Sequence, residues 1–368
     1  MNKRVFSLGK IFGIPLAVDY TWFLIFALMI WTLATGYFPS EYKNWPAAQY
    51  WIVGAVTALL FFGSVLVHEI AHSLAALRFK IPVHRIVLYI FGGASEISQE
   101  SPDAWIDFWI TLVGPAVNLA LWGLLSLAGL VLPGATPVAA VVEYLATINL
   151  LLGLFNLIPG YPLDGGRILM AVIWGVSHKK TRAVMVAASI GSFFAYLFII
   201  IGVALLISGN ILNGVWIAFI GWFVLNASGG EARRERLKSE LAGHTVVEAM
   251  SRSYVTINAN TPLQSLADEI LLGGGKRSLL VKQGDTVVGL ATMHVLQTVP
   301  QDQWPFTTVS QVMIPTQKMK QITPQTDIWE AMEALDKDGV NQLPVVVDGQ
   351  IQGILSREDV ISFLRRLG

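Results

Sequence analysis

The sequence predicts a polytopic α-helical membrane protein of about six transmembrane helices, with a short β-hairpin or sheet after the second helix, followed by a soluble α/β domain. The composition supports this fold class. Hydrophobic residues make up 54% of the chain and charged residues 14%, against roughly 45–50% and about 25% in average globular proteins. Long apolar runs recur up to about residue 230, whereas charges become frequent from Glu231 onward.

Six stretches have about the 20 apolar residues that a helix needs to cross a bilayer. They run over about 15–38, 50–78, 105–132, 137–158 with a continuation to about 175, 186–208 and 211–228. Only Gly209 and Asn210 separate the last two stretches. We expect the first stretch to be retained, because it is longer than a signal-peptide core and no small-residue cleavage site follows it.

The distribution of Lys and Arg predicts the orientation of these helices. Basic residues gather at alternate ends of the spans: Lys3, Arg4 and Lys10, then Arg78, Lys80 and Arg85, then Lys179, Lys180 and Arg182, then Arg233, Arg234 and Arg236. Cytoplasmic loops carry such an excess. We therefore expect both termini in the cytoplasm, and a multi-pass protein in the inner membrane of a prokaryote or in an organelle equivalent.

The charge and cysteine content exclude several classes of function. The formal net charge is zero, so no basic field suggests binding to nucleic acid. The chain contains no cysteine, which excludes disulfides and thiolate metal sites. Any metal must be held by histidine and carboxylate ligands.

The run His68-Glu69-Ile70-Ala71-His72 predicts a zinc site in the second span. Two histidines four residues apart on a helix lie on one face and can share a Zn²⁺ ion. Glu69 lies about 100° round the helix from His68, within reach of a metal-bound water for which it can act as general base. Polar groups at this depth are costly unless they bind a ligand or line a wet cavity.

A catalytic zinc of this type needs a third, carboxylate ligand and an open fourth position. Asp164 is the strongest candidate among the few acidic residues of the apolar half. It lies where prolines and glycines interrupt the fourth span, and such non-helical backbone is tolerated at membrane depth where it lines a cavity. Alternatively, Asp164 caps the helix that resumes at Gly165.

Together these motifs resemble the site-2 protease family, whose members are intramembrane zinc metalloproteases that cut single-span membrane proteins. The resemblance rests on the HEIAH run and on the later N-x-x-P-x-x-x-x-D-G run that starts at Asn156, and it covers about residues 1–228. It implies one Zn²⁺ per chain on His68, His72 and Asp164, with Glu69 as the base. The implied substrates include membrane-bound anti-sigma factors and transcription factor precursors, cut near the cytoplasmic face.

Further polar and glycine residues are candidates for substrate contacts. Asn118 ends a Gly-Pro-Ala-Val-Asn run that resembles another family motif; it and Asn156 offer amide N–H groups to substrate or oxyanion, or else hydrogen-bond between helices. Gly92 and Gly93 follow a predicted strand whose exposed edge could receive an unwound substrate, or which is a plain connecting hairpin. His84 is expected to be a surface residue of this loop.

The charged tail contains an internal repeat, with Met250 recurring as Met313. Each unit is expected to contain a short strand, a helix (266–272 and 328–336), two strands joined by a tight turn and a closing helix. The repeat resembles a tandem pair of cystathionine-β-synthase (CBS) modules, which implies adenine-nucleotide binding (ATP, ADP or AMP) at Gly353, Ser356 and Asp359. The alternative is that Asp359 caps the last helix and that the pair only forms a homodimer.

These observations divide the chain into an apolar catalytic domain (1–230), a linker (231–243) and two CBS modules (244–302 and 308–367). The leading hypothesis is a regulated intramembrane endopeptidase. A transporter or channel with a nucleotide-sensing tail is the main alternative, and a catalytically silent scaffold is the third.

Overall fold

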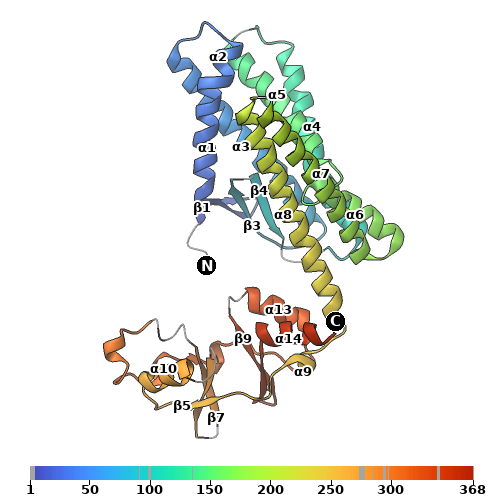
Figure 1. Ribbon diagram of the computed structural model, residues 1–368. Coiled ribbons are helices and arrows are strands. Elements are labelled where there is room, and N and C mark those ends of the chain that lie inside the picture. The colour runs from blue at the N-terminus through green and yellow to red at the C-terminus, as the bar shows by residue number, and fades with distance from the viewer. Residues whose placement is uncertain are drawn as a thin grey trace. The chain divides into compact units, whose positions relative to one another are not determined.

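The computed structural model describes residues 5–90, 92–97, 101–134, 136–272, 278–284, 286–292, 296, 298–337 and 340–367. The chain forms two compact units, Met1–Glu235 and Arg236–Gly368 (Figure 1). Each unit has its own core.

The first unit is built from long helices. They are α1 (Tyr20–Thr32), continued by the π-helical turn η1 (Leu33–Tyr37) and α2 (Phe38–Glu41), then α3 (Ala47–Arg78), α4 (Ala104–Gly129), α5 (Pro137–Asn156), α6 (Asp164–Ser177), α7 (Lys180–Ile207) and α8 (Ile211–Leu241). Among the described residues, five helical stretches are long and apolar enough to cross a membrane: Tyr20–Glu41, α3, α4, α5 and α7. They confirm five of the six predicted spans. The sixth, 211–228, falls in α8, which is not among these five.

A four-stranded sheet packs beside these helices. It contains β1 (Val5–Ile11), β2 (Ile14–Asp19), β3 (Val83–Tyr89) and β4 (Gly92–Ile97), in the order β1-β2-β3-β4 with β2 parallel to β3. The sequence predicted the hairpin of β3 and β4 but not the N-terminal strands, and it began the first span too early. A short apolar run fits a buried strand as well as the start of a helix. The missed boundary signal is Asp19, whose side chain accepts from Thr21 N and caps α1.

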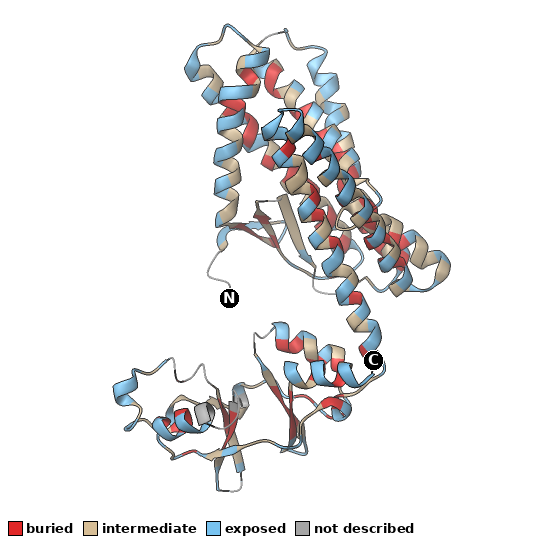
Figure 2. Cartoon of the chain, viewed as in Figure 1, coloured by how far each residue is buried: buried red, intermediate tan, exposed pale blue. Residues whose placement is uncertain are grey.

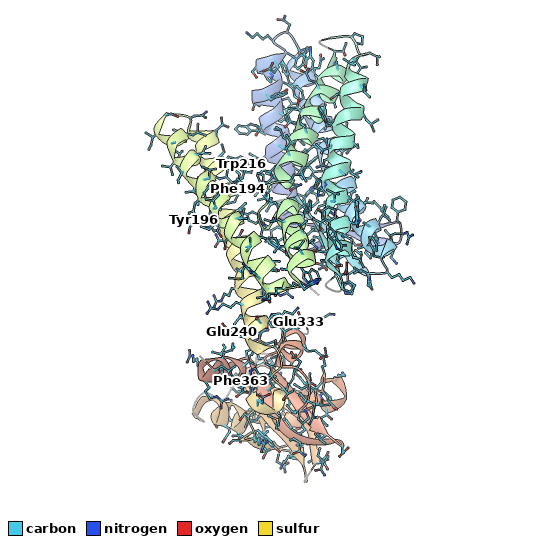
Figure 3. All side chains as sticks on the ribbon, turned by 90° about the vertical axis from the view of Figure 1, so that its right-hand side faces the viewer. Phe194, Tyr196, Trp216, Glu240, Glu333 and Phe363 are labelled. Atoms are coloured by element: carbon cyan, nitrogen blue, oxygen red, sulfur yellow. The ribbon has the colours of Figure 1, made fainter. Side chains whose placement is uncertain are left out.

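Exposed residues follow the outward faces of the long helices, and buried residues follow their inward faces (Figure 2). Many of the exposed residues on these helices are large and apolar. Tyr196 of α7 and Trp216 of α8, labelled in Figure 3, are about half exposed. Exposed apolar surface of this extent suits contact with lipid.

The fourth predicted span is interrupted where the prolines and glycines stand. Helix α5 ends at Asn156, residues 157–163 are not helical, and α6 begins at Asp164. Tyr161 N donates to Ala187 O of α7, and Ser228 Oγ of α8 donates to Tyr161 O. The non-helical segment is thus anchored by two neighbouring helices, as backbone at membrane depth requires.

The second unit contains the two repeats. The first has α9 (Val246–Ala249), β5 (Thr256–Asn258), α10 (Leu263–Leu272), β6 (Ser278–Gln283) and β7 (Thr286–Thr292). The second has α12 (Val309–Val312), β8 (Ile314–Pro315), α13 (Ile328–Lys337), β9 (Gln342–Val347), β10 (Gln350–Ser356) and α14 (Arg357–Leu367). The closing helix predicted for the first repeat falls around residues 293–297, of which only Leu296 is described.

Each repeat lends backbone to the sheet of the other. Strand β8 of the second repeat pairs with β7 of the first, and Ser251 of the first pairs with Ile354 of β10. The approach is close at Gly353, where an added Cβ atom would lie 2.8 Å from Ser251 O. The two repeats therefore bury each other, as expected of units that are incomplete alone.

Candidate metal centre

Helix α3 places His68 and His72 one turn apart on its buried face. Their exposed fractions are 6% and 8%, and their Nε2 atoms lie 3.1 Å apart. His72 Nδ1 donates to Ile110 O at 2.7 Å, so in the neutral imidazole Nε2 is the nitrogen that carries the lone pair. A partner of this kind fixes the tautomer and the ring orientation of a metal-ligating histidine.

Asp164 joins the two histidines from α6. Its Oδ2 lies 3.2 Å from His68 Nε2 and 3.3 Å from His72 Nε2. This oxygen is buried without a hydrogen-bond partner among the described residues, and no side chain caps the start of α6. Of the two predicted roles for Asp164, the geometry favours ligation over capping.

The three donor atoms fit a zinc ion. They are separated by 3.1–3.3 Å, while the ligands of a tetrahedral Zn²⁺ with bonds of about 2.0–2.1 Å lie about 3.3–3.4 Å apart. A histidine lone pair facing a carboxylate oxygen at this distance is repulsive unless a cation lies between them. Two imidazoles and one carboxylate, with no cysteine in the chain, form a donor set typical of catalytic zinc.

Helix α4 closes one side of the centre through Gly114. A Cβ atom at this position would lie 2.2 Å from His72 Nε2 and 2.7 Å from His68 Cε1. The imidazoles therefore pack directly against the α4 backbone, and any larger residue would displace them.

Glu69 lies beside the histidines on the side where a cavity of about 240 Å³ opens. The cavity is lined by Glu69, His72, Gly93, Ala94, Ser95, Ile97, Pro162, Asp164 and Arg167. Ser95 Oγ donates to Glu69 Oε2 at 2.7 Å, and Ser73 Oγ donates to Ser95 Oγ at 3.0 Å. The carboxylate is thus held in place by Ser95, and Glu69 is among the residues that line the cavity.

Strand β4 forms a wall of this cavity and is the outer strand of its sheet. Gly92 adopts a φ of +128°, which favours glycine. At Gly93 a Cβ atom would lie 2.4 Å from Glu69 Cγ, so only glycine lets the strand approach the glutamate this closely. His84 of β3 is exposed, as expected.

Neither of the two asparagines is among the residues that line the cavity. Asn118 of α4 is 1% exposed, and its Oδ1 has no hydrogen-bond partner in the described part of the chain. Asn156 is the last residue of α5 and is half-buried.

Several residues of the site were not predicted from the sequence. They are Ser95, which holds Glu69, the carbonyl of Ile110, which holds His72, and Arg167, which lines the cavity and pairs with Asp107 at 2.8 Å. Only Asp107 could have indicated one of these contacts from the sequence, because a carboxylate inside an apolar span is expected to have a charged or hydrogen-bonding partner.

In the second unit, two of the three predicted nucleotide residues, Ser356 and Asp359, form a helix cap. Asp359 Oδ2 accepts from Ser356 N at 2.9 Å and from Ser356 Oγ at 2.5 Å, and Ser356 Oγ accepts from Asp359 N at 3.1 Å. These bonds begin α14. Gly353 lies three residues before, where Ser251 approaches closely.

A buried histidine pair and aspartate, set beside a glutamate within long apolar helices, define the class of membrane zinc metalloproteases. The family model for peptidase family M50 matches residues 56–142 and 134–200, and that for the CBS domain matches residues 309–366.

Relatives of the same class extend along the whole chain. The Synechocystis protein sll0528, whose name describes it as a zinc metalloprotease, is 33% identical to this chain. The match covers 99% of this chain and 96% of the length of sll0528. Rip3 of Mycobacterium tuberculosis, whose name also describes a zinc metalloprotease, is 32% identical over 97% of this chain and 92% of its own length. The chain therefore belongs to peptidase family M50, the site-2 protease family, with a C-terminal CBS domain, and is a zinc metalloprotease of a multi-pass membrane type.

Two solved structures are similar to part of the chain. The site-2 protease of Methanocaldococcus jannaschii covers 62% of this chain and 95% of its own at 28% identity, with a TM-score of 0.45. The CBS domain of a bacterial CNNM/CorC family Mg²⁺ transporter, solved with ATP, covers 37% and 97% at 21% identity, with a TM-score of 0.32.

Proposed function

We propose that this protein is an intramembrane endopeptidase that cuts single-span membrane proteins near the cytoplasmic face. His68, His72 and Asp164 hold one Zn²⁺ ion, and Glu69 is the general base. One observation carries this proposal: three donor atoms from α3 and α6 converge within 3.3 Å of one another beside a glutamate that lines a cavity.

The residues of the site divide the work of peptide hydrolysis. When bound, Zn²⁺ acts as a Lewis acid that acidifies water and polarises the scissile carbonyl. Glu69 takes a proton from the attacking water and returns it to the leaving amine. Ser95 fixes the direction of the Glu69 carboxylate, and Ile110 O fixes the imidazole of His72.

Strand β4 is the proposed docking edge for the substrate. A helical substrate hides its carbonyls and must unwind before cleavage, and an extended segment can add to the outer edge of a sheet. Gly92 and Gly93 begin this edge beside Glu69. Asn118 and Asn156, expected from the sequence to donate to the substrate or oxyanion, are not among the residues that line this cavity, so only a contact with the substrate outside it is proposed for them.

The proposed topology follows the basic loops. Both termini, the segment that follows Arg78 at the end of α3 and the connection at Lys179 face the cytoplasm. The membrane is a prokaryotic inner membrane or its organelle equivalent. The catalytic domain spans residues 1–230. The proposed substrates are anti-sigma factors and precursors of transcription factors that cross the membrane once, because their single helix can unwind and enter the site.

The CBS pair is proposed to sense an adenine nucleotide. ATP, ADP or AMP would bind near Gly353, Ser356 and Asp359, and a homodimer would form through the pair. A carboxylate accepts from two vicinal ribose hydroxyls, and Asp359 is a half-buried carboxylate at a helix start. An unchanged cleavage rate across physiological nucleotide concentrations would remove this regulatory role.

The proposal is tested by co-expression with candidate single-span membrane proteins. We expect the wild-type protein to release a cytoplasmic fragment and Glu69→Gln to release none while keeping about one zinc per chain. Glu69→Gln is a matched variant because it preserves the shape of the side chain and removes only its basicity. Proteolysis retained in Glu69→Gln would refute the mechanism.

A further inference from the structure

Arg167 brings a permanent positive charge to the active-site cavity. It stands in α6, three residues after Asp164, and its side chain lines the same cavity as Glu69 and His72. Among the described residues that line the cavity, Arg167 is the only one with a permanent positive charge. The others are acidic, polar or apolar, and His72 is a proposed zinc ligand.

Asp107 of α4 fixes the orientation of this cation. Its Oδ1 accepts from Arg167 Nη2 at 2.8 Å, and its side chain is only 7% exposed. A buried carboxylate so placed holds a guanidinium firmly, because an unpaired buried charge is strongly destabilising. A guanidinium has five N–H donors, and the Arg167 side chain remains 35% exposed. Donors therefore remain for a ligand in the cavity.

Peptide hydrolysis places negative charge on the carbonyl oxygen, and N–H donors of this kind can stabilise that charge. As the water oxygen bonds to the scissile carbon, the carbonyl π electrons move onto the oxygen, which becomes negative. Fixed N–H groups aimed at that oxygen lower the barrier. The two asparagines proposed as donors do not line the cavity, whereas Arg167 does.

We propose that Arg167 is a catalytic residue, held by Asp107 as a positioning residue, that donates N–H to the scissile carbonyl and stabilises its developing charge. This inference rests on the proposed proteolytic function. Arg167 keeps its protons throughout the step. The water proton passes to Glu69 and then to the amine nitrogen as the C–N bond breaks, and the oxyanion electrons return to the carbonyl.

The test compares full-length variants in vesicles with a substrate that the wild type cleaves. We expect Arg167→Gln to keep about one zinc per chain and a KM near that of the wild type, while kcat falls roughly 10²–10³-fold, as for other lost oxyanion donors. Asp107→Asn should lower kcat less. Arg182→Gln, which alters an exposed arginine of α7, is the matched control and should cleave normally.

Chemical rescue separates catalysis from a merely structural link between α4 and α6. Guanidinium chloride at millimolar concentration should restore cleavage to Arg167→Ala, whereas methylammonium should not, and Glu69→Gln should not respond to either. Wild-type kcat in Arg167→Gln would overturn the proposal, and so would loss of zinc without rescue. If the wild type itself cleaves none of the substrates, the proposed function fails and the inference fails with it.

Discussion

Asp164 and Asp359 both stand in the first turn of a helix, yet their carboxylates have different surroundings. Asp359 accepts from Ser356 N and Oγ at the start of α14. Asp164 receives no such bond at the start of α6, and its buried oxygen faces two histidine nitrogens instead. An aspartate in the first turn of a helix is thus a cap in one unit and a metal-ligand candidate in the other.

The difference lies in the partners, not in the helix. Ser356 precedes Asp359 by three residues and supplies a local donor, whereas the partners of Asp164 come from α3, more than 90 residues earlier in the chain. A polar group deprived of local donors inside an apolar unit must find a distant partner or bind a ligand. The comparison therefore predicts very different consequences for the two substitutions.

The largest contrast is expected between Asp164→Ala and Asp359→Ala. Loss of Asp164 removes one of three donors, so zinc should be lost and cleavage should fall to background. Asp359→Ala should keep about one zinc per chain and near-normal cleavage without nucleotide. Metal analysis and a cleavage assay on both proteins check this, and full zinc in Asp164→Ala would break the comparison.

Gly114→Ala should come next in severity. The new methyl group would press on both imidazoles. We therefore expect zinc affinity to fall by at least about 100-fold, which is more than the usual effect of removing a hydrogen-bond partner of a metal ligand. Gly123→Ala on the same helix is the control, because nothing lies within 4 Å of its Cβ position. Competition with a zinc chelator measures both, and equal affinities would show that the packing does not constrain the site.

Ser95→Ala should give an intermediate loss. Removing the hydrogen bond to a charged group costs about 1.5 kcal/mol or more, so kcat should fall about tenfold while zinc stays bound. Ser73→Ala, which removes only the donor to Ser95, should have a smaller effect. An unchanged kcat in Ser95→Ala would show that Glu69 needs no orienting partner.

The smallest effect is expected from the helix cap itself. Ser356→Ala should destabilise the start of α14 by about 1 kcal/mol, which corresponds to roughly fivefold faster hydrogen exchange of its amides in the full-length protein. The amides of α6 should exchange as in the wild type. If α14 is unaffected, Asp359 is free for another role and the contrast with Asp164 weakens.

Local patterns predicted the parts of the site that neighbours in sequence define. The spacing of His68 and His72, the interrupted helix before Asp164 and the repeat of the tail all follow from short-range signals. Ser95 and the pair of Arg167 with Asp107 depend on contacts between residues 26 and 60 positions apart in the chain. The sequence shows that Asp107 needs a partner, but no local pattern says which residue that partner is. The N-terminal strands were missed because their length fits two structures equally.

The central claim is that two histidines and Asp164 hold the zinc beside Glu69. Zinc K-edge absorption of purified Glu69→Gln protein tests it most directly, because this variant keeps the ligands without turning over. We predict two imidazole nitrogens and carboxylate oxygen at about 2.0–2.1 Å, with the signal lost in Asp164→Ala. An unchanged spectrum in Asp164→Ala, or one without imidazole, would contradict the account.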